Sequence, residues 1–259
     1  MISPYTVFLD FDGTITIKDS LVVLLDTYAP ASWWKLETVM LDGHTSELET
    51  LQREMAMVDA TLDEALTLFD RTVAVDPSFP DLLAAAAALS APVIILSGGL
   101  RLIIDHVLDR AGYRAAEVRA NGIEVTGKSW TVSSTPFRSR CPGCNHCKTG
   151  SLVTVQDRGG MAVFAGDGST DRCPAWEADV LFAKDNLAEY CQRHGIPYEP
   201  FSSLSDIGHQ LHPEILDRLR TRRLAQMPMP NPFLKKYAVG RQQVGRDIKR
   251  VLDNKHGLL

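Results

Sequence analysis

An apolar run ends on two closely spaced carboxylates near the start of the chain. Residues 7–16 read VFLDFDGTIT, so Asp10 and Asp12 follow a strand-like segment and precede a glycine and a hydroxyl residue. A strand that delivers two carboxylates into a glycine-containing turn is suited to hold a cation and an anionic group at its carboxyl end. The alternative is an ordinary turn that closes a buried strand, because Asp and Gly are common turn residues.

A second apolar run ends in a different set of polar groups. Residues 92–99 read PVIILSGG, which places Ser97 directly before Gly98 and a further glycine. Glycine backbone can approach an anion closely because it carries no side chain. This segment therefore predicts a strand that ends in a phosphate-sized cradle.

A third apolar run adds more carboxylates. Residues 161–171, MAVFAGDGSTD, place Asp167 and Asp171 just beyond a strand-like segment. Several oxygen ligands without softer partners indicate a hard cation such as Mg²⁺. Lys148 opens the helical stretch KTGSLVTVQDR, where a fixed ammonium could neutralise a phosphate or the crowded carboxylates.

Together these residues resemble the motifs of the haloacid dehalogenase superfamily of phosphohydrolases. The resemblance spans about residues 5–210 and is carried, in the family's order, by Asp10, Asp12, Thr14, Ser97, Lys148, Asp167 and Asp171. It implies that Asp10 is the nucleophile that forms an aspartyl phosphate, and that Asp12 protonates the leaving oxygen and later activates water. Such roles are chemically sound, because a carboxylate attacks phosphorus competently when a metal neutralises the phosphoryl oxygens.

The resemblance also implies how ligands are held. Mg²⁺ would bind the Asp10 side chain, the Asp12 backbone carbonyl and Asp167, and Asp171 would be a further ligand or a residue that orients the ligands. The phosphoryl group would be held by a set of hydroxyl, backbone and ammonium donors: Thr14, Ser97, Gly98 and Lys148.

Strand-like and helical segments alternate along most of the chain, which predicts an α/β fold with a doubly wound, Rossmann-like parallel sheet. We expect residues 1–16 and 91–211 to form this phosphatase core domain. Residues 17–90 are too many for one crossover helix, and their periodic stretches TLDEALTLFD and DLLAAAAALS predict a small helical bundle. In the superfamily an insertion at this point is a cap, which excludes water and selects the substrate.

A closer resemblance lies within and after the insertion. The segments DFDGTITIKDS, YAPASWW, SELETLQREM and ADVLFAKDNLAEYC are similar to the methionine-salvage branch, the 2-hydroxy-3-keto-5-methylthiopentenyl-1-phosphate phosphatases, a sister group of the phosphoserine phosphatases. The segment CPGCNHCK resembles that branch and also the phosphoethanolamine/phosphocholine phosphatases. We therefore expect a magnesium-dependent phosphomonoesterase of a small phosphorylated metabolite, with phosphoserine and phosphoethanolamine or phosphocholine as alternative substrates.

Substrate contacts within the insertion follow from the phosphoserine phosphatases. There an acidic residue at the position of Asp19 and an arginine near that of Arg53 contact the substrate. The alternatives are a helix N-terminal carboxylate for Asp19 and a solvated helix face for Arg53. Trp33 and Trp34 could line the same pocket, but their pattern favours buried aromatics of the cap.

Two rival functions remain. A catalytically silent phosphate-binding regulatory module would require a damaged set of motif residues, whereas every one of them is present. A phosphotransferase or mutase would differ only in the acceptor that takes the phosphoryl group from the aspartate.

Cysteines cluster just before Lys148. Cys141, Cys144 and Cys147 have a spacing that lets thiolates converge on one structural zinc ion, with Cys173 or His146 as a fourth ligand. Free thiols or a disulfide are the alternatives.

The charge is distributed unevenly. Residues 212–259 carry eleven Lys and Arg against four Asp and Glu, while the preceding residues have a balance of −12. Apolar positions recur at helical spacing after the MPMPNP segment, from Leu234 to Leu252. We expect a basic C-terminal extension that docks on the acidic body or on a dimer mate rather than on nucleic acid.

The length of 259 residues and the 45% hydrophobic content suffice for a full core plus an insertion. The sequence has no apolar run of membrane-spanning length, and because the first residues lead directly into a strand-like segment we expect no signal peptide. We therefore expect a cytoplasmic protein without a membrane partner.

Overall fold

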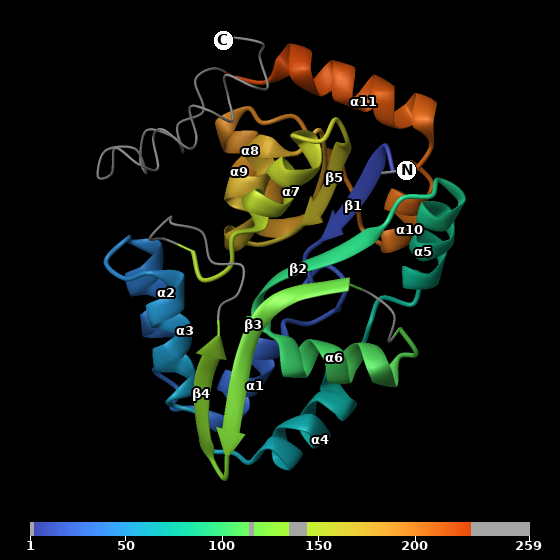
Figure 1. Ribbon diagram of the computed structural model, residues 1–259. Coiled ribbons are helices and arrows are strands. Elements are labelled where there is room, and N and C mark those ends of the chain that lie inside the picture. The colour runs from blue at the N-terminus through green and yellow to red at the C-terminus, as the bar shows by residue number, and fades with distance from the viewer. Residues whose placement is uncertain (1–2, 114–116, 135–143, 229–259) are drawn as a thin grey trace. The chain divides into compact units, whose positions relative to one another are not determined.

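The computed structural model describes residues 3–113, 117–134 and 144–228 of the chain (Figure 1). Its strands are β1 (Tyr5–Leu9), β2 (Val93–Leu100), β3 (Glu117–Thr126), β4 (Ser129–Ser134), β5 (Met161–Gly166), β6 (Val180–Ala183) and β7 (Glu199–Pro200). Its helices are α1 (Ser20–Tyr28), α2 (Trp34–Leu41), α3 (Glu47–Met55), α4 (Leu62–Thr72), α5 (Phe79–Ala88), α6 (Arg101–Arg110), α7 (Lys148–Gln156), α8 (Arg172–Glu177), α9 (Asp185–His194), α10 (Leu204–Gly208) and α11 (Pro213–Gln226), with a short 3-10 helix, η1 (Ser169–Asp171).

The strands form a seven-stranded, mostly parallel sheet in the order β4-β3-β2-β1-β5-β6-β7. Strand β5 pairs in parallel with β1 and β6, and β6 pairs in parallel with β7, whereas β3 and β4 form an antiparallel hairpin. All six residues of β5 and all four of β6 are buried, as expected for parallel strands covered on both faces. The predicted α/β, Rossmann-like fold is therefore confirmed.

Most predicted elements agree with the observed ones. The apolar runs at 92–99 and 161–166 form β2 and β5, and the stretch that starts at Lys148 forms α7. The two-residue strand β7 has no apolar pattern of its own, because it is defined only by its pairing with β6. None of the helices in the described ranges has both the length and the apolar character needed to cross a bilayer.

Helix ends coincide with capping residues. Asp19, Ser46 and Thr61 accept hydrogen bonds from backbone N–H groups in the first turns of α1, α3 and α4. Such oxygens satisfy donors that have no partner within the helix. Helix α9 ends at His194 and is capped by Gly195, whose φ of 66° lies in the left-handed region that glycine adopts readily.

The chain divides into two compact units. The first holds the residues up to Leu9, Ser78–Ile94 and the residues from Lys148 onward. Within it, α10 packs on α5, and the backbone N–H of Ser205 donates to Ser78 Oγ at 3.0 Å. The second unit holds Asp10–Pro77 and Ile95–Cys147. The predicted insertion thus contributes α1–α4 to the second unit and α5 to the first, and its assignment as a cap domain stays a prediction.

An antiparallel bridge closes the segment that contains α1–α4. Thr16 pairs with Val75, the N–H of Ile17 donates to the carbonyl of Ala74, and the N–H of Asp76 donates to the carbonyl of Ile15. The two ends of this helical segment therefore meet within the second unit.

Helix α11 is the part of the basic extension that the structure describes. The positions from Leu234 to Leu252 lie outside the described residues. Near the end of α11, the buried guanidinium of Arg223 donates to the carbonyls of Ala175, Ala178 and Pro197. Burial lowers the pKa of Arg223 to about 10. This side chain fastens α11 to the rest of the first unit.

We expect Arg223→Met to lower the free energy of unfolding by about 3 kcal/mol, because three carbonyls lose their charged donor. Urea denaturation measures this difference. Arg222→Met is the matched control, since Arg222 is half exposed and pairs with Glu199 at the surface, and its loss should cost about 1 kcal/mol or less. Equal effects of the two substitutions would contradict the anchoring role of Arg223.

Candidate active site

Strand pairing places two of the predicted aspartates at one sheet edge. Leu9 of β1 is paired with Ala165 of β5, and the chain continues directly into Asp10 after β1 and into Asp167 after β5. Parallel strands carry their carboxyl ends to the same edge, so these two side chains emerge side by side.

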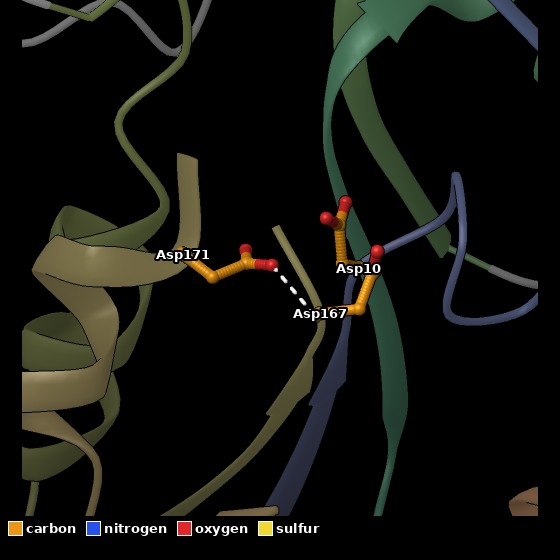
Figure 2. A group of neighbouring side chains, drawn as sticks. All are labelled: Asp10, Asp167 and Asp171. Atoms are coloured by element: carbon orange, nitrogen blue, oxygen red, sulfur yellow. Dashed lines mark hydrogen bonds between the residues drawn. The ribbon is translucent and has the colours of Figure 1, made fainter. Parts of the chain in front are cut away.

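A third carboxylate completes the group. Asp10, Asp167 and Asp171 each offer one oxygen, and these oxygens lie within 4.8 Å of one another (Figure 2). Asp10 and Asp171 are buried, and Asp167 is half-buried. Clustered carboxylate oxygens are the ligands that hard divalent cations prefer, so the donor set fits Mg²⁺.

Asp171 organises the loop after β5. Its Oδ2 accepts a hydrogen bond from the backbone N–H of Asp167 at 3.0 Å (Figure 2). The backbone N–H of Gly168 donates to the same oxygen, also at 3.0 Å. The approach is so close that a Cβ atom on Gly166 would lie 2.4 Å from Asp171 Oδ2. Glycine is therefore required at position 166 because the Asp171 carboxylate occupies the space of a side chain.

Lys148, the first residue of α7, contacts this carboxylate from the other side. Its Nζ lies 2.6 Å from Asp171 Oδ1 and 3.2 Å from Thr170 Oγ1. Both members of the Lys148–Asp171 pair are almost fully buried. Lys148 and the three aspartates together carry one positive and three negative charges. The resulting formal charge of −2 favours a bound cation.

Within the second unit, Asp12 and Ser97 border the same glycine. Asp12 Oδ2 and Ser97 Oγ would each lie 3.1 Å from a Cβ atom on Gly99. Asp12 Oδ1 accepts from the N–H of Ser20 at the start of α1, at 2.7 Å. The structure thus brings together two predicted residues that are 85 positions apart in the sequence.

The turn after β1 is closed by side chains and backbone. Thr14 is buried, and its N–H donates to the carbonyl of Phe11. Gly13 has a φ of 73°, in the region that favours glycine, and its N–H donates to Thr16 Oγ1. Thr16 thus has a role in the turn that the motif residues do not include, and a hydroxyl three residues after a turn glycine is a local signal for it.

Two buried asparagines that have no motif in the sequence contact Gly98, near the carboxyl end of β2. Asn121 Nδ2 and Asn145 Nδ2 donate to the carbonyl of Gly98, at 2.8 and 2.9 Å. Neither contact has a local sequence signal, because the partners are 23 and 47 residues apart.

Asp19 lies at the N-terminus of a helix and Arg53 lies on a solvated helix face, the two alternatives to substrate contact. Asp19 caps α1 by accepting from the N–H of Val22, and the exposed Arg53 pairs with Glu49 one turn earlier on α3. Their role in binding substrate stays a prediction. The next residue, Glu54, was not singled out, and burial together with the neighbouring Glu37 carboxyl raises its pKa to about 9.

The cysteine cluster receives no support as a zinc site. Cys141 lies outside the described residues, and Cys144 and Cys147 form no disulfide in the described part of the chain. The group of metal-ligating side chains that the described residues form is the three aspartates.

Comparisons with known proteins agree with this geometry. A family model described as haloacid dehalogenase-like hydrolase matches residues 7–173. The chain is 27% identical over 213 residues to the 2-hydroxy-3-keto-5-methylthiopentenyl-1-phosphate phosphatase of Geobacillus kaustophilus, covering 80% of this chain and 95% of that protein. It is also 27% identical over 216 residues to the polyol phosphate phosphatase of Saccharomyces cerevisiae, covering 78% of this chain and 90% of that protein.

Among solved structures, the phosphoserine phosphatase from T. onnurineus has a similar fold, with a TM-score of 0.59 at 16% identity and coverage of 82% of this chain and 96% of that one. The family match spans the segments that carry Asp10, Ser97 and Asp167, and well over half of the sequence lies within it. The chain therefore belongs to the haloacid dehalogenase-like hydrolases.

Proposed function

We propose that this protein is a magnesium-dependent phosphomonoesterase that hydrolyses a small phosphorylated metabolite through an aspartyl-phosphate intermediate. The observation that carries the proposal is the group of Asp10, Asp167 and Asp171 at the edge of the sheet. Membership in the family and the two phosphatase relatives support it.

Asp10 is the proposed nucleophile. The N–H of Phe11 donates to Asp10 Oδ1 at 2.7 Å, which restricts the rotation of the carboxylate. One carboxylate oxygen attacks phosphorus, an acyl phosphate forms on Asp10, and the bond from phosphorus to the ester oxygen breaks. Water then attacks the same phosphorus, which releases phosphate and restores the carboxylate.

Asp12 is the proposed acid and base. Because the N–H of Ser20 donates to its Oδ1, the other oxygen is the one that lies beside Gly99 in the last residues of β2. In the first step this carboxyl protonates the departing alkoxide, and in the second it accepts the proton of the attacking water.

Asp10 and Asp167 would hold Mg²⁺, together with the backbone carbonyl of Asp12, and Asp171 would orient them through its hydrogen bonds to the loop. When bound, the ion would neutralise the carboxylates and the phosphoryl oxygens. Thr14, Ser97, Gly98 and Lys148 are the proposed donors to the phosphoryl group.

The substrate is a small phosphomonoester. The bacterial relative favours 2-hydroxy-3-keto-5-methylthiopentenyl 1-phosphate, and the yeast relative, at the same identity, favours a polyol phosphate. We propose that residues 17–90 act as the cap that selects between them, with Asp19 and Arg53 as substrate contacts, and that the enzyme is cytoplasmic. Turnover of both compounds and of phosphoserine by the purified protein with Mg²⁺ tests this assignment.

We expect Asp10→Asn to lower kcat by about 10⁴-fold or more, because the amide is not a nucleophile. Single-turnover trapping should then yield no covalent phosphoenzyme. The matched control is Asp63→Asn on the exposed face of α4, which should keep wild-type turnover. Trapped phosphate on any residue other than Asp10 would refute the assignment.

Asp12→Asn should lower the turnover of an alkyl phosphate by about 10²- to 10⁴-fold, because the leaving alkoxide then lacks an acid. The loss should be smaller for p-nitrophenyl phosphate, whose leaving group needs less protonation. Steady-state kinetics on both substrates measure the ratio. Equal losses on the two would argue against Asp12 as the acid.

We expect Gly166→Ala to raise the Mg²⁺ concentration needed for half-maximal activity, because the new Cβ atom would displace the Asp171 carboxylate. Thermal stabilisation by added Mg²⁺ should weaken in parallel, and chelation of Mg²⁺ should abolish turnover in both proteins. Gly168→Ala is the matched control, since its Cβ atom would lie 4.0 Å from Asp171 Oδ2. Unchanged Mg²⁺ dependence of Gly166→Ala would rule out this role for Asp171.

A further inference from the structure

The carbonyl of Gly98 lies between two buried carboxamides. Asn121 approaches from β3 and Asn145 from the segment before α7, and both Nδ2 groups donate to this one oxygen. Asn121 is fully buried and Asn145 is 6% exposed. All of these residues belong to the second unit.

The asparagines are held there at a cost to stability. The Oδ1 atoms of both side chains are buried and have no hydrogen-bond partner among the described residues. An unpaired buried amide oxygen destabilises the folded state, and an apolar side chain of similar size would avoid that cost. We therefore take the hydrogen bonds that the two Nδ2 groups donate to the Gly98 carbonyl as the reason for asparagine at both positions.

Asn145 is itself fixed in place. Its backbone N–H donates to Glu47, the first residue of α3, at 3.2 Å. Its Oδ1 would lie 3.1 Å from a Cβ atom on Gly98, so the amide packs directly on the glycine backbone. A side chain at position 98 would push this amide away from the carbonyl.

The effect of the two amides passes through one peptide unit. The carbonyl of Gly98 and the N–H of Gly99 are the two ends of the same planar group, so fixing the carbonyl also fixes the direction of the N–H. Donors on the carbonyl also polarise the peptide and make its N–H a stronger donor. That N–H donates to Ser97 Oγ at 2.9 Å.

This hydrogen bond leaves the hydroxyl group of Ser97 able to donate its hydrogen to another group. A serine hydroxyl has one hydrogen and two acceptor positions. Because the Gly99 N–H occupies an acceptor position, the hydroxyl hydrogen points away from Gly99.

We propose that Asn121 and Asn145 are positioning residues that orient the Ser97 hydroxyl as a hydrogen-bond donor to the phosphoryl group of the substrate. The inference rests on the proposed function, since it takes Ser97 as a phosphoryl contact. It also gives Asn145, which lies between Cys144 and Cys147, a role that requires no zinc.

The test is a double-mutant cycle with p-nitrophenyl phosphate as substrate and orthovanadate as an inhibitor that resembles the transferring phosphoryl group. We expect Asn121→Leu and Asn145→Leu each to lower kcat/KM and vanadate affinity by about tenfold, with an unchanged or higher melting temperature. In a Ser97→Ala background each should cost less than about twofold, because the hydroxyl that it orients is gone. Asn186→Leu, on the exposed face of α9, is the matched control for the exchange.

Two outcomes would overturn the proposal. One is a full tenfold loss in the Ser97→Ala background, which would mean that the asparagines act independently of Ser97. The other is failure of Asn145→Gln, which retains a carboxamide donor, to recover activity relative to Asn145→Leu. Should leucine at position 121 prevent folding, Asn121→Ala enters the same cycle with the same criterion. If this inference fails while turnover still depends on Asp10, the proposed function stands and only the role of the asparagines is wrong. If turnover does not depend on Asp10, the proposed function itself has failed.

Discussion

The parallel pairing of β1 with β5 forces negative charges together, and the site is arranged around that repulsion. Neighbouring strands lie about 4.8 Å apart, so aspartates that follow paired strand ends cannot separate. Two like charges at that distance repel by about 3 kcal/mol at an effective dielectric constant of 20. The ammonium of Lys148 neutralises one of the carboxylates by pairing with Asp171. The negative charge that remains on Asp10 and Asp167 favours a bound cation.

Local patterns made much of this arrangement predictable. An apolar run that is followed by Asp, Ser or Gly indicates both a strand and the polar group near its carboxyl end. For this reason β1, β2 and β5, and the polar residues near their carboxyl ends, could be predicted. The capping position of Asp19 and the pairing of Arg53 with Glu49 are also local, since they involve residues three or four positions apart. Spacing along the chain is therefore enough to suggest a cap for Asp19 and a solvated helix face for Arg53.

Long-range contacts were not predictable in this way. Arg223 donates to carbonyls 26 to 48 residues away, and Asn121 and Asn145 meet Gly98 from distant segments. A single arginine or asparagine produces no periodic pattern, so only the fold reveals its partner. In the cysteine-rich segment the thiols have a regular spacing that suggests a shared ligand, whereas Asn145, which lies between them, is part of no pattern.

The segment that contains Asn145 and Lys148 links two parts of the chemistry. Asn145 donates to the carbonyl of Gly98 in β2, and three residues later Lys148 contacts Asp171 after β5. Because three residues span at most about 11 Å, these two contacts are coupled by the length of the chain. A deletion or insertion between them would disturb both, whereas a substitution of Cys147 would alter neither donor.

The bridge between Thr16 and Val75 has a consequence for how this protein could diverge. A segment whose two ends already meet can change in length or sequence without moving the strand that precedes it, because the entry and exit points stay together. Helices α1–α4 form such a segment, while Asp10 and Asp12 lie just before its first bridged residues. Under the proposed function, new substrate preferences could therefore arise by exchange of this segment, with Asp10 and Asp12 inherited unchanged.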